Sequence, residues 1–425
     1  MYSIINRSEL VKLLINLFVI SVSKILPVAG LLALNLFLAA NLDVTVYGQY
    51  AIASSALFFM GPLLSWGTAD VVLRKVSVYS HSGQDHLSKN LLSRAIILTS
   101  VFSMILFCAL FAFNHLFKYE NIFFSLLYCA PVIAYSILIS SNSRGSGHII
   151  SSQIYDIFFK SMMLLIFFIF LSLNYLMTER LTSSFYLSAL ITLVVIFWRI
   201  KFSDIATNFL NYKNARRYIA LILNGSPYLV ISLTQGLKNF ADLFVVGFML
   251  GSASAAVYSI ALQIVLVISF GQMIISILLS RKISFSLKHS NIEQLSFWFR
   301  RSTYLSGLLG VCYVFLVLFF GESIVISFLG IEYGQAFELA MVLGLGRLFH
   351  LSVGPVMQIM ALSNNQASAS KISLQIGLIN VILSIILVFY FGVMGAAFAG
   401  AISIALWGYL LKRKVVKLYP TLRVW

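Results

Sequence analysis

Long apolar segments alternate with short polar ones along the whole chain. Each apolar segment extends over roughly 20 residues, the length that a helix needs to cross about 30 Å of bilayer hydrocarbon. A backbone in lipid must satisfy its own hydrogen bonds, so each segment is predicted to be a helix. The pattern predicts an all-α integral membrane protein with about 12 transmembrane helices. The segments are 11–40, 46–69, 93–114, 121–141, 153–175, 182–200, 218–249, 256–280, 303–320, 336–362, 372–391 and 394–411.

The composition excludes a water-soluble protein. Of the 425 residues, 60% are apolar and 10% are charged, whereas about a quarter of the residues of a soluble protein are charged. The sequence contains no glycine-rich phosphate-binding loop and no His, Cys or acidic cluster with metal-ligand spacing. The three cysteines, Cys108, Cys129 and Cys312, lie inside apolar segments and are predicted to be core residues without disulfides. We expect a protein that is not an enzyme and that uses no cofactor or metal.

The net charge of +16 is explained by membrane topology. If the N-terminus is cytoplasmic, the cytoplasmic segments carry 23 Lys and Arg residues, whereas the outer loops carry two, Lys118 and Arg180. This positive-inside distribution predicts that both termini are cytoplasmic. The first apolar segment is too long for a cleaved signal peptide and is predicted to remain as a membrane helix. Because the basic loops also face anionic lipid headgroups, nucleic acid is not expected as a partner.

A weak internal repeat predicts two halves. The segments 46–53 and 254–261 share Tyr, Ile and Ala at matching positions, at an offset of 208 residues. Each half contains six predicted helices, so both start on the same side and the repeat is parallel, about an axis along the membrane normal. We expect two six-helix lobes, 1–212 and 213–425, with the substrate site between them.

Five of the six prolines lie inside the predicted helices. A proline inside a helix removes a backbone hydrogen bond and kinks the helix. Bent helices suit a protein that opens to alternate sides of the membrane, and simple packing kinks are the alternative. These prolines are Pro27, Pro62, Pro131, Pro227 and Pro355.

Two basic residues near mid-membrane, Lys24 and Arg347, have no acid one helical turn away. A charge at the bilayer centre costs roughly 2.5–3.5 kcal/mol on insertion scales, so each needs a partner or an aqueous cavity. We interpret both as part of a cationic cavity that contacts an anionic substrate. In the alternative, structural interpretation, Glu338 or the region of the fourth and fifth predicted helices pairs with Arg347. Backbone carbonyls or an acid of another helix satisfy Lys24. His350 is predicted to be a packed core residue, with a proton relay as the alternative.

Two other basic residues in the predicted helices each have an acid four residues away, which allows an ion pair on one helix face. Lys238 is predicted either to line the cationic cavity or to form a structural pair with Asp242. For Asp156 and Lys160 the structural pair is favoured, because Lys160 is near the cytoplasmic face and can extend to it. Asp156, Asp242 and Glu338 are also candidate sites for coupling to protons or sodium.

Two short motifs resemble signatures of polysaccharide flippases. The segment 42–50, LDVTVYGQY, resembles the L-x-P-x-x-(Y/F)-G-x-Y signature that follows the first helix, with Val44 at the proline position. The segments 242–251 and 257–261 resemble the signature of the seventh and eighth helices, with Ala256 where glycine is frequent. Together with helix number, length and topology, these motifs resemble the multidrug/oligosaccharidyl-lipid/polysaccharide exporter superfamily, and within it the Wzx-type O-antigen flippases.

This resemblance implies a MATE-like fold and translocation of an undecaprenyl-diphosphate-linked oligosaccharide, the O-antigen repeat unit of lipopolysaccharide biosynthesis, across the bacterial inner membrane by alternating access. Lys24, with Arg347 and Lys238, would contact the diphosphate. A glycan polymerase and a chain-length regulator are candidate partners, beside the membrane lipid. The alternatives are a cation-coupled multidrug exporter of the same superfamily, which would prefer an acidic cavity, and a scaffold of the glycan-assembly machinery without transport.

Overall fold

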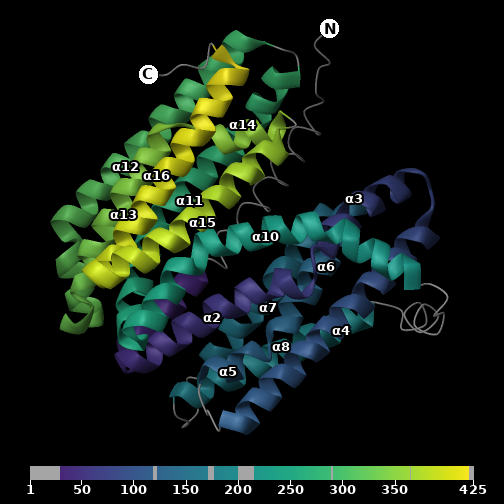
Figure 1. The fold of residues 1–425 in the computed structure, drawn as a ribbon, viewed down its shortest axis with the longest axis horizontal. Coiled ribbons are helices and arrows are strands. Elements are labelled where there is room, and N and C mark those ends of the chain that lie inside the picture. Colours follow the sequence, from purple (N-terminus) through teal and green to yellow (C-terminus); the bar gives the residue numbers. More distant parts are fainter. Residues whose placement is uncertain are drawn as a thin grey trace. The chain divides into compact units, whose positions relative to one another are not determined.

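The computed structural model describes residues 29–117, 122–170, 177–199, 215–288, 291–363 and 365–420. Within these ranges every regular element is a helix (Figure 1), which confirms the all-α prediction. The first helix is Ala29–Asn41. It is followed by α2 (Val44–Leu64), α3 (Thr68–His81), α4 (Asp85–Phe117), α5 (Ile122–Leu127), α6 (Ala130–Gly145), α7 (Ile149–Phe170), α8 (Met177–Arg199), α10 (Ala215–Leu250), α11 (Ser252–Lys288), α12 (Ile292–Leu329), η2 (Ile331–Tyr333), α13 (Gln335–Ser352), α14 (Val356–Leu362), α15 (Gln366–Phe391) and α16 (Val393–Leu418).

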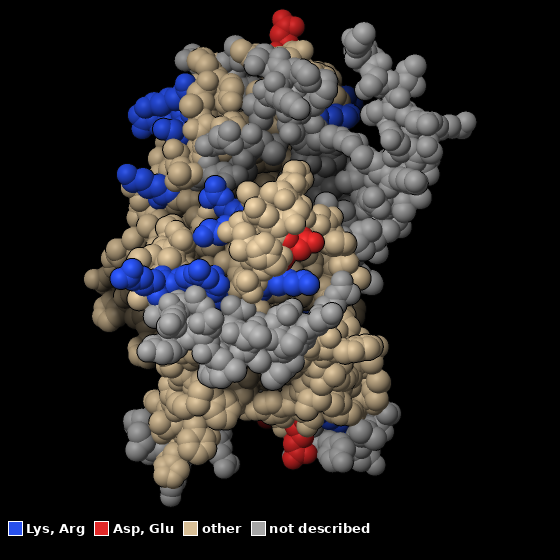
Figure 2. Space-filling view, turned by 90° about the vertical axis from the view of Figure 1, so that its right-hand side faces the viewer, with Lys and Arg blue, Asp and Glu red and all other residues tan. Residues whose placement is uncertain are grey.

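The helices and their surface are those of a multi-pass membrane protein. In the described ranges, eight helices are long and apolar enough to cross a membrane, or up to nine if the bent pair α2–α3 is one span. Large apolar side chains of α12, such as Phe319, Phe320 and Ile324, are more than half exposed. Figure 2 shows a mostly uncharged surface on which basic side chains are more frequent than acidic ones. Lipid solvates such a surface, whereas water does not.

Two prolines that were predicted to kink helices stand at helix starts instead. Pro355 is the N-cap of α14, so the predicted tenth segment is divided into α13 and α14. Pro131 lies in the first turn of α6. The missing N–H is tolerated there because the first N–H groups of a helix have no acceptor within it. Pro62 and Pro227 lie inside α2 and α10 as predicted, and Pro27 lies outside the described residues.

The described residues form two compact units. The N-terminal unit takes the described residues of Met1–Phe37 and Ala53–Leu233, and the C-terminal unit takes those of Leu38–Ile52 and Thr234–Trp425. Helices α2 and α10 each contribute to both units. The lobes 1–212 and 213–425 are defined by the sequence repeat and by the even number of helices in each half. The compact units follow a different criterion, so the two lobes stay a prediction.

In the N-terminal unit, α2 and α3 are bent by 48° relative to each other. Gly67 stands at the bend with φ of 66°, a left-handed conformation that glycine adopts without strain. A side chain at this position would collide with the backbone of Gly225 in α10. Near the bend, the Trp66 ring stacks on Phe102 of α4, with ring centroids 4.9 Å apart. The bend therefore depends on close packing of α2, α4 and α10.

In the C-terminal unit, α11, α12, α13, α15 and α16 pack side by side (Figure 1), with the first turns of α2 against them. Gly48 of α2 lies so close to the carbonyl of Ser252 that no side chain would fit. Tyr47 accepts a hydrogen bond of 2.7 Å from Gln263 Nε2, and its ring packs edge-on against Tyr333. Helices α2 and α11 begin 208 residues apart, the offset of the sequence repeat.

Candidate functional site

Asp242 of α10 is a buried carboxylate with three hydrogen-bond donors. Asn380 and Ser384, one turn apart on α15, donate to Oδ1 at 2.6 and 2.8 Å. Tyr258 of α11 donates to Oδ2 at 3.3 Å. Gly400 of α16 makes room for the carboxylate, since a Cβ at this position would lie 2.9 Å from Oδ2. Four helices therefore enclose one acid whose charge is satisfied by polar side chains of the protein.

Lys238, one turn before Asp242 on α10, has a different partner. Its Nζ lies 3.7 Å from the ring centre of Trp407 on α16. Two contacts hold Trp407 in place. Its Nε1 donates a hydrogen bond of 2.9 Å to Ser373 Oγ, and its ring stacks on the His350 ring with ring centroids 4.8 Å apart. Within the described part of the chain, Lys238 forms no ion pair, either with Asp242 or with another acid. The two i, i+4 partners of α10 are therefore satisfied separately.

Arg347 of α13 is the second cation of this region. Its Nε is buried and has no hydrogen-bond partner among the described residues. The guanidinium lies close enough to Lys238 and Tyr313 for electrostatic interaction. Glu338 is exposed and lies nine residues earlier on α13, about 13 Å along the helix axis, too far for an ion pair. Lys238 and Arg347, which we call the cationic pair, thus leave a local excess of positive charge in this unit.

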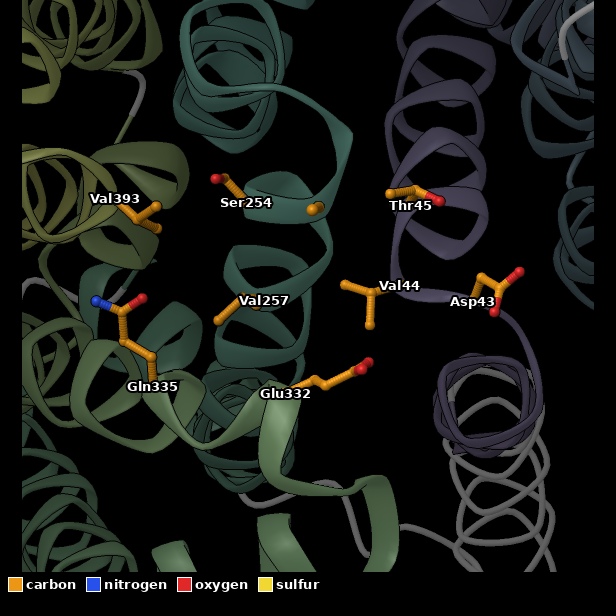
Figure 3. A pocket seen from close by; sticks show the side chains of 9 residues that line it. Asp43, Val44, Thr45, Ser254, Val257, Glu332, Gln335 and Val393 are labelled. Atoms are coloured by element: carbon orange, nitrogen blue, oxygen red, sulfur yellow. The ribbon is translucent and has the colours of Figure 1, made fainter.

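An open pocket marks one end of the C-terminal unit (Figure 3). It has a volume of about 580 Å³ and is formed by the starts of α2, α11, α13 and α16 together with η2. We call it the end pocket. It is lined by Asp43, Val44, Thr45, Ala253, Ser254, Val257, Glu332, Gln335 and Val393.

The cationic pair lies far along the helices from the end pocket. Arg347 is 12 residues after Gln335 on α13, which corresponds to about 18 Å at 1.5 Å per residue. Trp407, the partner of Lys238, is 14 residues after Val393 on α16, or about 21 Å. Lys238 is 12 residues before the end of α10, about 18 Å, where α10 joins α11 at the pocket. Three helices therefore place the charges at a similar depth, inside the roughly 30 Å of hydrocarbon.

The other predicted site residues are only partly described. Lys160 of α7 lies in the N-terminal unit, with Nζ 4.6 Å from the ring centre of Phe58. The backbone of Asp156 is helical, but its side chain lies outside the described residues, as does all of Lys24. Of the predicted cationic cavity, the structure brings Lys238 and Arg347 together, while the position of Lys24 stays a prediction.

The sequence analysis did not identify the partners of Asp242 and Lys238. Asn380 and Ser384 are polar residues four apart in a mostly apolar segment, a signal that they share one helix face. Trp407 gives no such signal, because an aromatic residue in an apolar segment is usually a packing residue. His350 was predicted to be packed, and it is buried between the Trp407 ring and Gly408, where a Cβ would lie 2.8 Å from Nδ1.

Comparisons with known proteins agree with the predicted fold. No protein-family model matches the chain. Over 204 residues it is 28% identical to the probable low-salt glycan biosynthesis flippase Agl15 of Haloferax volcanii. This match covers 46% of the chain and 41% of that protein, so the chain spans less than half the length of this relative.

Two kinds of transporter share the fold. An inward-facing multidrug resistance MATE family transporter of the MOP superfamily is similar with a TM-score of 0.73 and 14% identity, over 93% of this chain and 95% of the other. The lipid II flippase MurJ is similar with a TM-score of 0.70 and 17% identity, over 94% and 87%. By their names these proteins are transporters and flippases rather than enzymes. The chain is thus a multi-pass membrane protein with the fold of MOP-superfamily transporters.

Proposed function

We propose that this protein is a flippase that moves an undecaprenyl-diphosphate-linked oligosaccharide, an O-antigen repeat unit, across the bacterial inner membrane. The cationic pair carries the proposal. Two partly buried cations that lack described acidic partners are costly in hydrocarbon, and a diphosphate would neutralise both. The sequence likeness to a glycan biosynthesis flippase and the fold shared with a lipid II flippase support the same substrate class.

The substrate would be divided by its chemistry. Its diphosphate would bind Lys238 and Arg347, joined by Lys24, while the lipid tail stays in the bilayer and the sugars cross between the lobes 1–212 and 213–425. With both termini cytoplasmic and the cell interior negative, each negative charge moved outwards gains roughly 2.3 kcal/mol per 100 mV. The membrane potential would therefore assist transport. Glycan polymerase and chain-length regulator would act on the product at the outer face.

Asp242 is the described acid best placed for coupling to a cation. It is buried within one turn of Lys238, and it changes charge if it binds a proton or a sodium ion. Coupling through Asp242, with Asp156 and Glu338 as further candidates, is part of the proposal.

A cation-coupled multidrug exporter is the second candidate. It is favoured by the structural likeness to a multidrug transporter and by the buried Asp242, which suits a cationic substrate. The two candidates predict opposite roles for the cationic pair, because positive charge repels a cationic drug and attracts a diphosphate.

Complementation of a flippase-deficient O-antigen strain, supplied with the cognate glycan genes, separates the candidates. The wild type should restore surface glycan, and Lys238→Ala with Arg347→Ala should not. Lys24→Ala should fail while Lys24→Arg works. Lys282→Ala is the matched control, because Lys282 also lies over a tryptophan ring, Trp298, with 3.9 Å to the ring centre, but in an exposed position.

Each outcome is informative if all variants are present in the membrane at equal amounts. Full surface glycan in the double alanine variant contradicts the proposed diphosphate site. A wild type that confers drug resistance but restores no glycan replaces the flippase with the exporter. A wild type that does neither, while it supports assembly together with another flippase, would indicate a scaffold.

A further inference from the structure

The end pocket contains a second, oppositely charged set of groups. Asp43 precedes α2 and Glu332 belongs to η2, so two segments far apart in sequence each contribute one acidic residue to the lining of this open pocket. In Figure 3 the Glu332 side chain extends toward the segment that carries Asp43. Both side chains are exposed, and neither has an ion-pair partner among the described residues.

The rest of the lining fits a hydroxyl-rich ligand rather than a metal ion. Thr45, Ser254 and Gln335 offer hydroxyl and amide groups, and valines form apolar walls. Carboxylates and amides accept hydrogen bonds from neighbouring hydroxyls, and apolar walls match the C–H faces of sugar rings. The described residues contain no group of three His, Cys, Asp or Glu that would hold a metal. A volume of about 580 Å³ is that of a small-molecule site.

The end pocket and the cationic pair lie on the same helices. Helix α13 carries Gln335 in the pocket and Arg347 about 18 Å further on, and α16 carries Val393 and Trp407 about 21 Å apart. Along these helices the acidic end pocket comes first and the cationic pair lies deeper. A molecule with sugars at one end and an anionic group at the other matches this order. The acidic pocket would repel a diphosphate, so the substrate would bind in one orientation, with its sugars in the pocket and its diphosphate at the cationic pair. On the predicted topology the pocket faces the outside, the side to which the sugars are delivered.

We propose that the end pocket binds the saccharide portion of the transported lipid-linked oligosaccharide, a subsite that rests on the proposed flippase function. Asp43 and Glu332 accept hydrogen bonds from sugar hydroxyls. Thr45, Ser254 and Gln335 complete the polar contacts, while the diphosphate is held about 18 Å away by Arg347 and Lys238. The pocket thus distinguishes a glycosylated lipid diphosphate from the bare one.

Binding to the purified full-length protein in detergent tests this subsite. One probe is the pool of lipid-diphosphate-linked oligosaccharides extracted from the source cells, and the other is the same pool after enzymatic removal of its sugars. Asp43→Ala combined with Glu332→Ala should weaken binding of the glycosylated pool about tenfold to a hundredfold. Binding of the sugar-free pool should stay within about twofold, because it lacks the hydroxyls. Lys238→Ala with Arg347→Ala should weaken binding of both pools.

The controls separate the possible failures. Glu322→Ala removes an exposed carboxylate of α12 outside the pocket and should change neither affinity. Asp43→Asn with Glu332→Gln keeps hydrogen-bonding groups of the same shape and should retain more saccharide binding than the alanine variant. An alanine variant that binds the glycosylated pool like the wild type overturns the subsite. The pocket is a cation site instead if the wild type binds Ca²⁺ or tetraphenylphosphonium and the Asp43→Asn, Glu332→Gln variant does not, while both bind the glycosylated pool equally. That result overturns the saccharide subsite. A wild type that binds neither pool contradicts the proposed function itself.

Discussion

Asp242 and the cationic pair show two ways of placing charge inside a membrane protein. Asp242 receives hydrogen bonds from Asn380, Ser384 and Tyr258, so the protein satisfies its charge without a ligand. Lys238, one turn away on α10, and Arg347 on α13 have no described acidic partner. A charge that the fold satisfies supports the fold, whereas a charge that it leaves unsatisfied is suited to a ligand. The comparison predicts that removing each charge has a different consequence.

Removal of the cationic pair should have the largest effect, and it should fall on transport. Lys238→Ala and Arg347→Ala should each lower the initial transport rate in proteoliposomes at least about tenfold, and together more than about a hundredfold, because each charge–phosphate contact is lost. The free energy of unfolding should not fall, because the alanine variants no longer bury a poorly neutralised charge. A double variant that transports normally, or that loses activity only because it unfolds, would contradict the comparison.

Removal of Asp242 should act first on stability. Asp242→Ala leaves three buried donors without their acceptor and should lower the free energy of unfolding by about 2–3 kcal/mol. Asp242→Asn keeps an acceptor oxygen and should cost about 1 kcal/mol. Thermal unfolding in detergent measures both. If Asp242→Ala is as stable as the wild type, the hydrogen bonds at Asp242 do not contribute to the fold and the contrast with Lys238 fails.

Trp407 should matter for the position of Lys238 rather than for its charge. A cation–π contact is worth about 0.5–2 kcal/mol, so Trp407→Leu should reduce transport by about twofold to thirtyfold. Trp407→Phe keeps a ring but loses the hydrogen bond to Ser373, and it should retain more activity. The readout is transport rate against the concentration of lipid-linked substrate. Equal activity of the leucine variant and the wild type would show that Lys238 does not depend on this ring.

The smallest expected effect is at Gly400. Gly400→Ala places a Cβ 2.9 Å from Asp242 Oδ2 and 3.1 Å from Leu343, a crowding that costs at least about 1 kcal/mol. Alanine in a helix regains about 0.5–1 kcal/mol over glycine. Gly400→Ala should therefore lower the free energy of unfolding only slightly. Thermal unfolding of this variant can be compared with that of Gly392→Ala. Gly392 has open space but φ of 59°, so it tests backbone strain rather than crowding.

The sequence predicted the helices better than the site. Apolar segments of membrane length are a local property, and α4, α8, α15 and α16 appear where those segments lie. The break before Pro355 was not predicted, because a Gly-Pro pair inside an apolar segment is compatible with a kink in one helix as well as with a break between two helices. Lys238 and Asp242 were identified because charges in apolar segments are conspicuous. Their separate partners were not, because Trp407, Asn380 and Ser384 come from helices more than a hundred residues away.

The cationic pair is proposed to bind the diphosphate of a lipid-linked substrate. Native mass spectrometry of the purified protein with undecaprenyl diphosphate and with undecaprenol measures this preference directly. The wild type should prefer the diphosphate by about a hundredfold or more, and Lys238→Gln with Arg347→Gln, which keeps Lys24, should lose most of this preference. A double variant that keeps the wild-type preference for the diphosphate would contradict the claim.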